Sequence, residues 1–212
     1  MDTNAIIDSV HKVEGQLWVD RINDAYRMGR LCQWVSTFHP QSLSCQLEGT
    51  FHHGAFNAGM KFVFGDGTAW MVRFPRVGMI CNQFVDEKVA MEVSALGLIQ
   101  RSTTIPVPKV HAWGLAATNP LGLGPFIIMD FIDGVSLIDI FRDPESQHPS
   151  RVIREDISDD DIESVYRQMA NFLLQLFRLE FGQIDSLPPP QGQSQGRGHM
   201  TKEEFIARAS LA

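Results

Sequence analysis

The stretch MKFVFGDGTAWMVRFP (residues 60–75) decides the fold class. Two runs rich in apolar residues flank the turn GDG, which is a combination typical of a β-hairpin. In the second run, Trp70, Val72 and Phe74 share one face of the expected strand, and Arg73 lies on the other. The stretch therefore predicts two paired antiparallel strands, one of which carries a cation on the face opposite its large apolar side chains.

The surrounding sequence adds three more strands and one long helix to this hairpin. We expect strands over residues 45–51, 60–64, 68–74, 109–113 and 125–131. The apolar spacing of residues 84–100 predicts a helix between the third and fourth strands. This order predicts an α+β fold, with a five-stranded antiparallel sheet and one inserted helix.

Further helices are expected on both sides of the sheet segment. Residues 13–36 have an imperfect helical spacing of apolar residues, and the pair His39-Pro40 ends the pattern. Ser158, followed by three aspartates, predicts the start of a helix over residues 159–181. Apolar residues occupy more than half of the circumference of that helix.

The expected helices and strands suggest a division of the chain into five segments. We expect an N-terminal helical extension, a sheet lobe, the start of a helical lobe, a flexible linker rich in Pro, Gln and Gly, and an incomplete helix. Their respective ranges are 1–40, 41–134, 135–187, 188–200 and 201–212.

The composition excludes several classes of protein. The 212 residues include 18 Lys and Arg against 25 Asp and Glu, which gives a net charge of −7. Residues 1–106 are nearly neutral and residues 107–212 are acidic, so neither half offers the basic surface of a nucleic-acid binder. No apolar run is long enough to span a membrane. We therefore expect no nucleic-acid partner and no membrane partner.

The cysteines indicate a reducing compartment. Cys32, Cys45 and Cys81 are odd in number and lack metal-ligand spacing, so neither a disulfide framework nor a zinc site is expected. The N-terminal residues have neither the apolar run of a secretory signal nor the arginines of a transit peptide. We expect a cytoplasmic protein without a metal site of its own.

Four features together suggest a phosphate-binding site, although each has a simpler explanation. The turn at residues 54–57 places a glycine between two strands, where backbone N–H groups can approach a phosphate or simply close a hairpin. Arg73 either faces solvent or has a buried partner. Glu92 can pair with Arg73 or lie on a solvated helix face. Residues 126–134 form either a core strand or an edge that recognises a base.

In this order, the four features resemble the nucleotide-binding lobe of kinase-like folds. The chain resembles the aminoglycoside phosphotransferase and choline kinase group of the protein-kinase-like superfamily. The similarity covers roughly residues 45–187, and its most specific part is TIPVPKV followed by GPFIIMDFIDG. It implies a protein-kinase-like N-terminal lobe followed by an incomplete helical C-terminal lobe.

The resemblance also implies roles for particular residues. ATP, with Mg²⁺ if bound, is the implied cofactor. Gly54, Ala55, Phe56 and Asn57 would lie over its phosphates, Arg73 would contact them, and Glu92 would pair with Arg73. The adenine would lie against the backbone of Met129, Asp130, Phe131 and Ile132. A small-molecule acceptor is implied only where a complete C-terminal lobe exists.

The chain lacks the catalytic half of such an enzyme. None of its histidines begins an H-x-D-x-x-x-x-N motif, and no later metal-binding Asp is found, so no catalytic residue is predicted. We expect a truncated phosphotransferase that is inactive alone, with a non-catalytic binding or regulatory module as the alternative. A structural interaction domain that binds no nucleotide is also open. The apolar face of helix 159–181 favours self-association.

Overall fold

The computed structural model describes residues 3–79, 82–143, 145, 153–181 and 187. These residues form two compact units. Residues 3–97 and 108–131 belong to the first unit, and residues 98–107 and 132–181 belong to the second. The expected linker at 188–200 and the expected helix at 201–212 lie outside the described residues.

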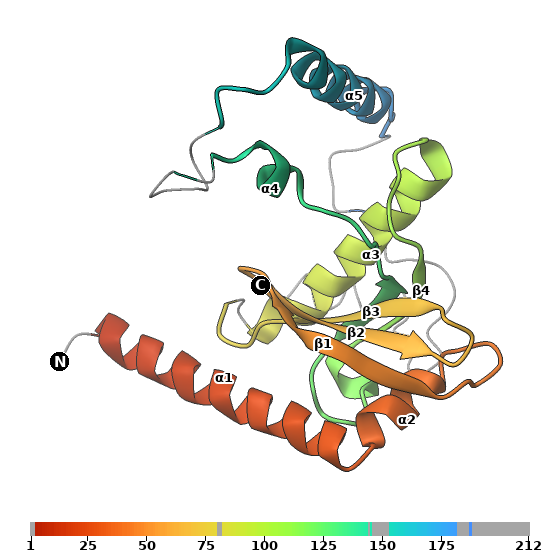
Figure 1. The fold of residues 1–212 in the computed structure, drawn as a ribbon. Coiled ribbons are helices and arrows are strands. Elements are labelled where there is room, and N and C mark those ends of the chain that lie inside the picture. Colours follow the sequence, from red (N-terminus) through yellow and green to blue (C-terminus); the bar gives the residue numbers. More distant parts are fainter. Residues whose placement is uncertain (1–2, 80–81, 144, 146–152, 182–186, 188–212) are drawn as a thin grey trace. The chain divides into compact units, whose positions relative to one another are not determined.

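The first unit contains a five-stranded antiparallel sheet (Figure 1). The spatial order of the strands is β1-β2-β3-β5-β4, so the fifth strand lies between the third and the fourth. The prediction of an α+β fold with this kind of sheet is confirmed. The strands are β1 (Cys45–His53), β2 (Asn57–Phe64), β3 (Ala69–Pro75), β4 (Val110–Gly114) and β5 (Phe126–Asp130).

Helices supply apolar side chains to both faces of this sheet. On one face, Trp18 and Trp34 join a core that includes Phe62, Phe74 and Phe126. These tryptophans come from α1 (Thr3–Arg27) and α2 (Arg30–Ser36). The residues that we expected as an N-terminal extension therefore contribute to the main core. The indole Nε1 of Trp18 donates to the carbonyl of Leu123 at 2.9 Å, which satisfies this buried polar group.

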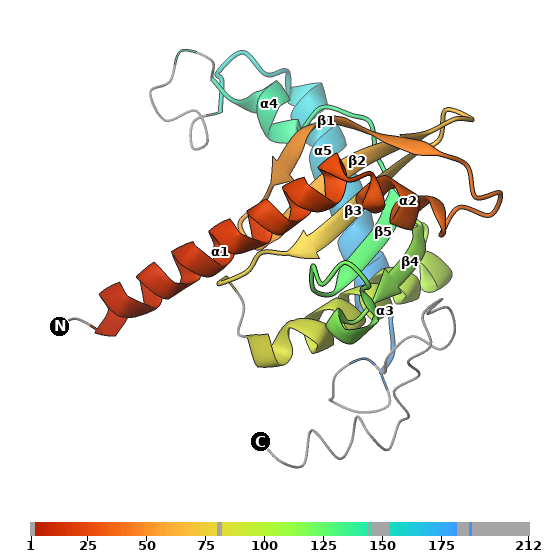
Figure 2. The ribbon, with the colours of Figure 1, turned by 90° about the horizontal axis from the view of Figure 1, so that it is seen from below.

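The opposite face of the sheet packs against α3 (Val85–Ser102). Val89 and Val93 of this helix form a second apolar cluster with Ile127 and Met129 of β5. The burial of both faces of β5 explains why its sequence is almost continuously apolar. Figure 2 shows the sheet of this unit from below, with α3 beside β4 and β5.

The prediction of one helix over residues 13–36 is wrong in two respects. The first helix already begins at Thr3, and the helical segment breaks into α1 and α2 around Gly29. Gly29 has a φ of 71°, which is a left-handed conformation that ends an α-helix and that glycine adopts at little cost. The break lets α2 change direction, so that Leu31 and Val35 are fully buried.

The connection between the first two strands is shorter than the sequence predicts. β1 continues through His53 and β2 already begins at Asn57, so only residues 54–56 form the turn. The N–H of Gly54 donates to the carbonyl of Asn57 at 2.9 Å and closes this hairpin. Asn57, which we expected in the turn, is thus the first residue of a strand.

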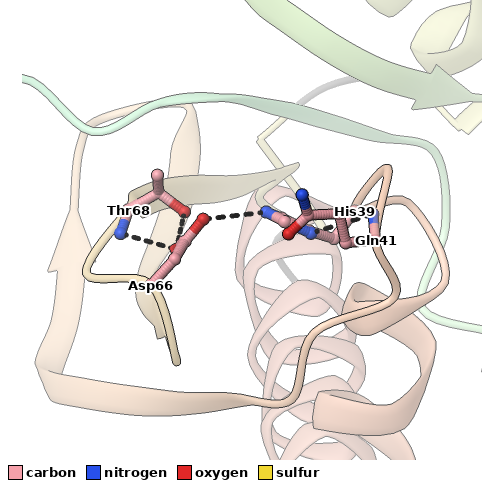
Figure 3. A network of polar contacts seen from close by, with 4 residues as sticks. All are labelled: His39, Gln41, Asp66 and Thr68. Carbon is pink, nitrogen blue, oxygen red and sulfur yellow. Dashed lines mark hydrogen bonds and ion pairs between the residues drawn. The ribbon is translucent and has the colours of Figure 1, made fainter.

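A small polar network links the segment after α2 to the GDG turn between β2 and β3 (Figure 3). The Asp66 carboxylate accepts bonds from the N–H and hydroxyl of Thr68, and these bonds lower the pKa of Asp66. His39 Nε2 lies 3.6 Å from Asp66, and His39 Nδ1 accepts a bond from the N–H of Gln41. The His39 ring packs near the rings of Phe64 in β2 and Trp70 in β3.

The second unit contains α4 (Leu137–Phe141) and α5 (Asp159–Phe177). The prediction of a helix start at Ser158 is confirmed, because its hydroxyl accepts a bond from the N–H of Asp161. None of the residues of α5 is buried, and Leu173 and Phe177 are 61% and 89% exposed. The apolar face expected for this helix is therefore not buried by the other residues of its own unit.

Candidate functional site

The candidate site lies on the face of the sheet that packs against α3. Strand register places Gly59, Arg73 and Ile127 in one row across β2, β3 and β5. The next row on this face contains Lys61, Met71 and Met129. A Cβ atom at Gly59 would lie 2.6 Å from the Met71 sulfur, so the glycine makes room for this side chain.

Arg73 and Glu92 form an ion pair between β3 and α3. The sequence left a solvent-facing Arg73 and a solvated Glu92 open, and the structure brings the two side chains together. Both are mostly shielded, with 25% and 28% of the side-chain area exposed. Burial lowers the pKa of Arg73, but a guanidinium keeps its charge at neutral pH. The Nε of Arg73 is shielded from solvent and has no acceptor among the described residues.

Lys88 adds a second cation to this ion pair. Its ammonium lies 3.4 Å from Glu92 Oε2, one helical turn further along α3, and 3.4 Å from the Asn57 amide oxygen. Burial and the positive charge of Arg73 both lower the pKa of Lys88. Two cations therefore share one carboxylate. We call Asn57, Arg73, Lys88 and Glu92 the cation cluster.

Arg76 fixes the turn between β1 and β2. Its guanidinium donates to the carbonyl of Gly54 at 3.0 Å, and its backbone N–H donates to the carbonyl of Phe56 at 2.8 Å. The turn is thus tied to the end of β3. The Phe56 side chain is 57% exposed. Of the four expected phosphate-loop residues, Asn57 accepts from Lys88 within the cation cluster, and the carbonyls of Gly54 and Phe56 accept from Arg76.

The segment at the end of β5 uses several of its polar groups within the sheet. Met129 is 5% exposed and packs against α3. The Asp130 carboxylate accepts from the N–H of Lys109 and lies 2.6 Å from His111 Nε2. The N–H groups of Asp130 and Phe131 donate to the carbonyls of Lys109 and Ala69. These two N–H groups are therefore already engaged by the neighbouring strands.

The last two residues of the expected adenine segment differ in their surroundings. The Lys61 ammonium lies 4.5 Å from the centre of the Phe131 ring, at a distance typical of a cation–π contact. Ile132 belongs to the second unit, and its side chain is 67% exposed. The structure therefore places Met129, Asp130 and Phe131 in the first unit and Ile132 at the start of the segment that follows it.

The sequence analysis missed three cations of this region. Lys88 and Glu92 are four residues apart in a helix, and this spacing could have indicated their contact. The contact of Lys88 with Asn57 bridges 31 residues and has no local signal. The roles of Arg76 and Lys61 likewise depend on the pairing of β2 with β3.

The described residues contain no group of three or more His, Cys, Asp or Glu side chains that could hold a metal ion. The chemistry available in the cation cluster is instead the recognition of a negative charge. Arginine and lysine donors beside a hairpin turn are suited to phosphate or carboxylate oxygens.

The fold and this site define an α+β protein with a cationic site between its antiparallel sheet and one helix. The chain is similar to "Altered inheritance of mitochondria protein 9, mitochondrial" from Zygosaccharomyces rouxii, with 25% identity over 138 residues. The similarity covers 65% of this chain but only 21% of that relative, so the chain spans about a fifth of the relative's length. No family model and no solved structure matches the chain.

No helix among the described residues is long and apolar enough to cross a membrane. The cysteines of this part of the chain, Cys32 and Cys45, are free thiols. The Cys45 Sγ lies 3.5 Å from the carbonyl of Cys32 and 3.6 Å from the Ser36 hydroxyl. Burial raises the pKa of both thiols, to about 11 for Cys45.

Proposed function

We propose that this chain carries the nucleotide-binding lobe of a kinase-like, ATP-dependent phosphotransferase of small molecules. The observation that carries the proposal is the ion pair between Arg73 of β3 and Glu92 of α3. The sequence resemblance implies such a pair at these two positions, and the two residues lie 19 positions apart in different elements. Phosphoryl transfer depends on cations that bind and orient the phosphates, which is the role proposed for Arg73.

Two further arrangements support this function. Asn57, at the start of β2, accepts from Lys88 in the cation cluster, so the hairpin turn lies near the cations. The inserted helix and the strand order agree with a sheet lobe that has one helix on the face of the site. In the proposal, Mg²⁺ arrives with ATP, and the residues for phosphoryl transfer belong to a part that this sequence does not contain.

The proposal predicts that the chain binds Mg·ATP with an affinity that depends on Arg73. Isothermal titration of the wild-type protein with Mg·ATP should give saturable binding, and Arg73→Met should weaken it by at least tenfold. Arg27→Met is the matched control, because Arg27 also pairs with a carboxylate but is 77% exposed on α1. Circular dichroism establishes whether the Arg73 variant folds, and Arg73→Lys keeps the charge if it does not.

Saturable binding that Arg73→Met and Arg27→Met leave equally intact would contradict the proposed site. A wild-type chain that binds no nucleotide at millimolar Mg·ATP would contradict the proposed function. The alternative is a non-catalytic binding or regulatory module, and reading the gene beyond Ala212 distinguishes it from an enzyme. An H-x-D-x-x-x-x-N motif downstream supports a phosphotransferase, whereas a stop codon with a stable protein supports the module.

The compartment of the protein stays a prediction. The sequence indicates the cytoplasm, and the name of the Zygosaccharomyces rouxii relative places that protein in the mitochondrion. We propose the cytoplasm for this chain and the mitochondrion as its alternative. Cell fractionation followed by immunoblotting with an antibody against residues 159–177 distinguishes the two.

A further inference from the structure

We propose that Lys88 of α3, in addition to Arg73, contacts a bound polyphosphate in this chain. The inference deepens the proposed function and rests on it for the identity of the natural ligand. The polyphosphate would lie at the cation cluster, between the start of β2 and the first turns of α3.

The first argument is the difference in accessibility between the two cations. The Nε and Nη2 atoms of Arg73 are shielded from solvent, and its guanidinium is paired with Glu92. Lys88 is slightly more open, with 31% of its side-chain area exposed against 25% for Arg73. An anion that enters from solvent therefore reaches the ammonium of Lys88 without separating the Arg73–Glu92 pair.

The second argument is that the present contacts of Lys88 are long for hydrogen bonds. Both of its distances, to Asn57 and to Glu92, are 3.4 Å, which exceeds the 2.7–3.2 Å of ordinary N–H···O hydrogen bonds. An ammonium has three donors, and the two long contacts leave at least one without an acceptor among the described residues. Phosphate oxygens are strong acceptors and form short, charge-assisted bonds with lysine.

The third argument is the charge balance of the cluster. Arg73 and Lys88 carry two positive charges, and Glu92 carries one negative charge, so the cluster has a net positive charge. Arg76 adds another cation at the neighbouring turn, where its guanidinium donates to the neutral carbonyl of Gly54. Asp86, the acid two residues before Lys88, accepts a bond from the N–H of Ala116 near β4. A bound polyanion would relieve the repulsion between Lys88 and Arg73.

Titration with sodium tripolyphosphate and with Mg·ATP tests this assignment. Lys88→Met should weaken the binding of both by roughly tenfold or more, since one charge-assisted contact is lost. Lys88→Arg should keep most of the affinity because the charge remains. Lys12→Met removes the same charge from α1, which packs against the opposite face of the sheet, and should change neither affinity.

A thermal-shift measurement separates ligand binding from a structural role. If Lys88 only joins Asn57 to Glu92, Lys88→Met should lower the melting temperature without ligand. If it binds polyphosphate, the variant should lose most of the increase that tripolyphosphate causes, whatever its melting temperature without ligand.

Each result bears on a different claim. Equal tripolyphosphate affinities for the wild type and Lys88→Met would overturn the assignment to Lys88, even if Mg·ATP binds. Lys88-dependent tripolyphosphate binding without preference for Mg·ATP would support the site and contradict the nucleotide function. A wild-type chain that binds neither probe would overturn both proposals.

Discussion

Replacing Glu92 by glutamine removes the only negative charge of the cation cluster and keeps the shape of the side chain. Lys88 Nζ lies 3.4 Å from Glu92 Oε2, and at an effective dielectric constant near 20 such a pair attracts by about 5 kcal/mol. Loss of one partner costs ~3–5 kcal/mol when the pair is buried and ~0–1 kcal/mol when it is exposed. The cluster is about a quarter to a third exposed, so we expect Glu92→Gln to cost about 2 kcal/mol.

Urea denaturation at pH 7, followed by circular dichroism, measures this change in the free energy of unfolding. Glu48→Gln is the matched control, because Glu48 lies 2.5 Å from Lys61 but is 57% exposed. Despite the shorter distance, we expect the control to lose only about 0.5 kcal/mol. The double variant Lys88→Met/Glu92→Gln should be more stable than Glu92→Gln alone, since one unpaired cation is gone.

The reasoning would be refuted if Glu92→Gln lost no more stability than Glu48→Gln. It would also fail if the double variant were no more stable than Glu92→Gln alone. Either result would mean that solvent already screens the cation cluster, so that burial does not increase the energy of the ion pair.

Three further predictions concern stability, reactivity and association. Gly15→Ala should stabilise the protein by about 0.5–1 kcal/mol, since Gly15 lies within α1 and an added Cβ would meet open space. Gly29→Ala should instead destabilise the protein by about 1 kcal/mol, because the φ of Gly29 is 71°. At pH 8, the pKa of about 11 should make Cys45 react with a thiol reagent roughly 100-fold more slowly than in the urea-unfolded chain. Replacing the exposed Leu173 and Phe177 of α5 by glutamate should reduce self-association in light scattering.

Each of these predictions has an outcome that contradicts it. If Gly15→Ala and Gly29→Ala both raised the free energy of unfolding, the left-handed conformation at Gly29 would not be required. Equal thiol reactivity in the native and unfolded chains would place Cys45 in an exposed position. A wild-type chain that is monomeric at all concentrations would show that the apolar face of α5 does not cause association.

The local patterns of the sequence predicted the central part of the fold well. The alternation around GDG placed β2 and β3 within a few residues, because the turn and the buried face indicate the same register. The residues by themselves left a solvent-facing Arg73 and a solvated Glu92 open, and only the family resemblance implied the ion pair that the structure contains. The break at Gly29 was missed because a helical apolar spacing continues across it, and only the backbone conformation reveals the change of direction.

The remaining features of the site depend on contacts between distant residues. The approach of Lys88 to Asn57 requires α3 to pack beside the start of β2, and no local pattern encodes that placement. The use of the Asp130 and Phe131 N–H groups follows from the pairing of β5 with its two neighbours. A sequence indicates which residues carry charge. Which backbone N–H groups can bind a ligand is known only once the pairing of the strands is known.

The position of β5 between β3 and β4 also has a consequence for how the chain folds during synthesis. The first three strands pair with their sequence neighbours across short turns, whereas the pairing of β3 with β5 must close a loop of about 50 residues. Loop closure of this kind slows folding. The ribosome must therefore release residues beyond Asp130 before β3 gains its second neighbour, and until then the edge of β3 is available to other chains. Chaperone dependence of the nascent chain should be greatest in that interval.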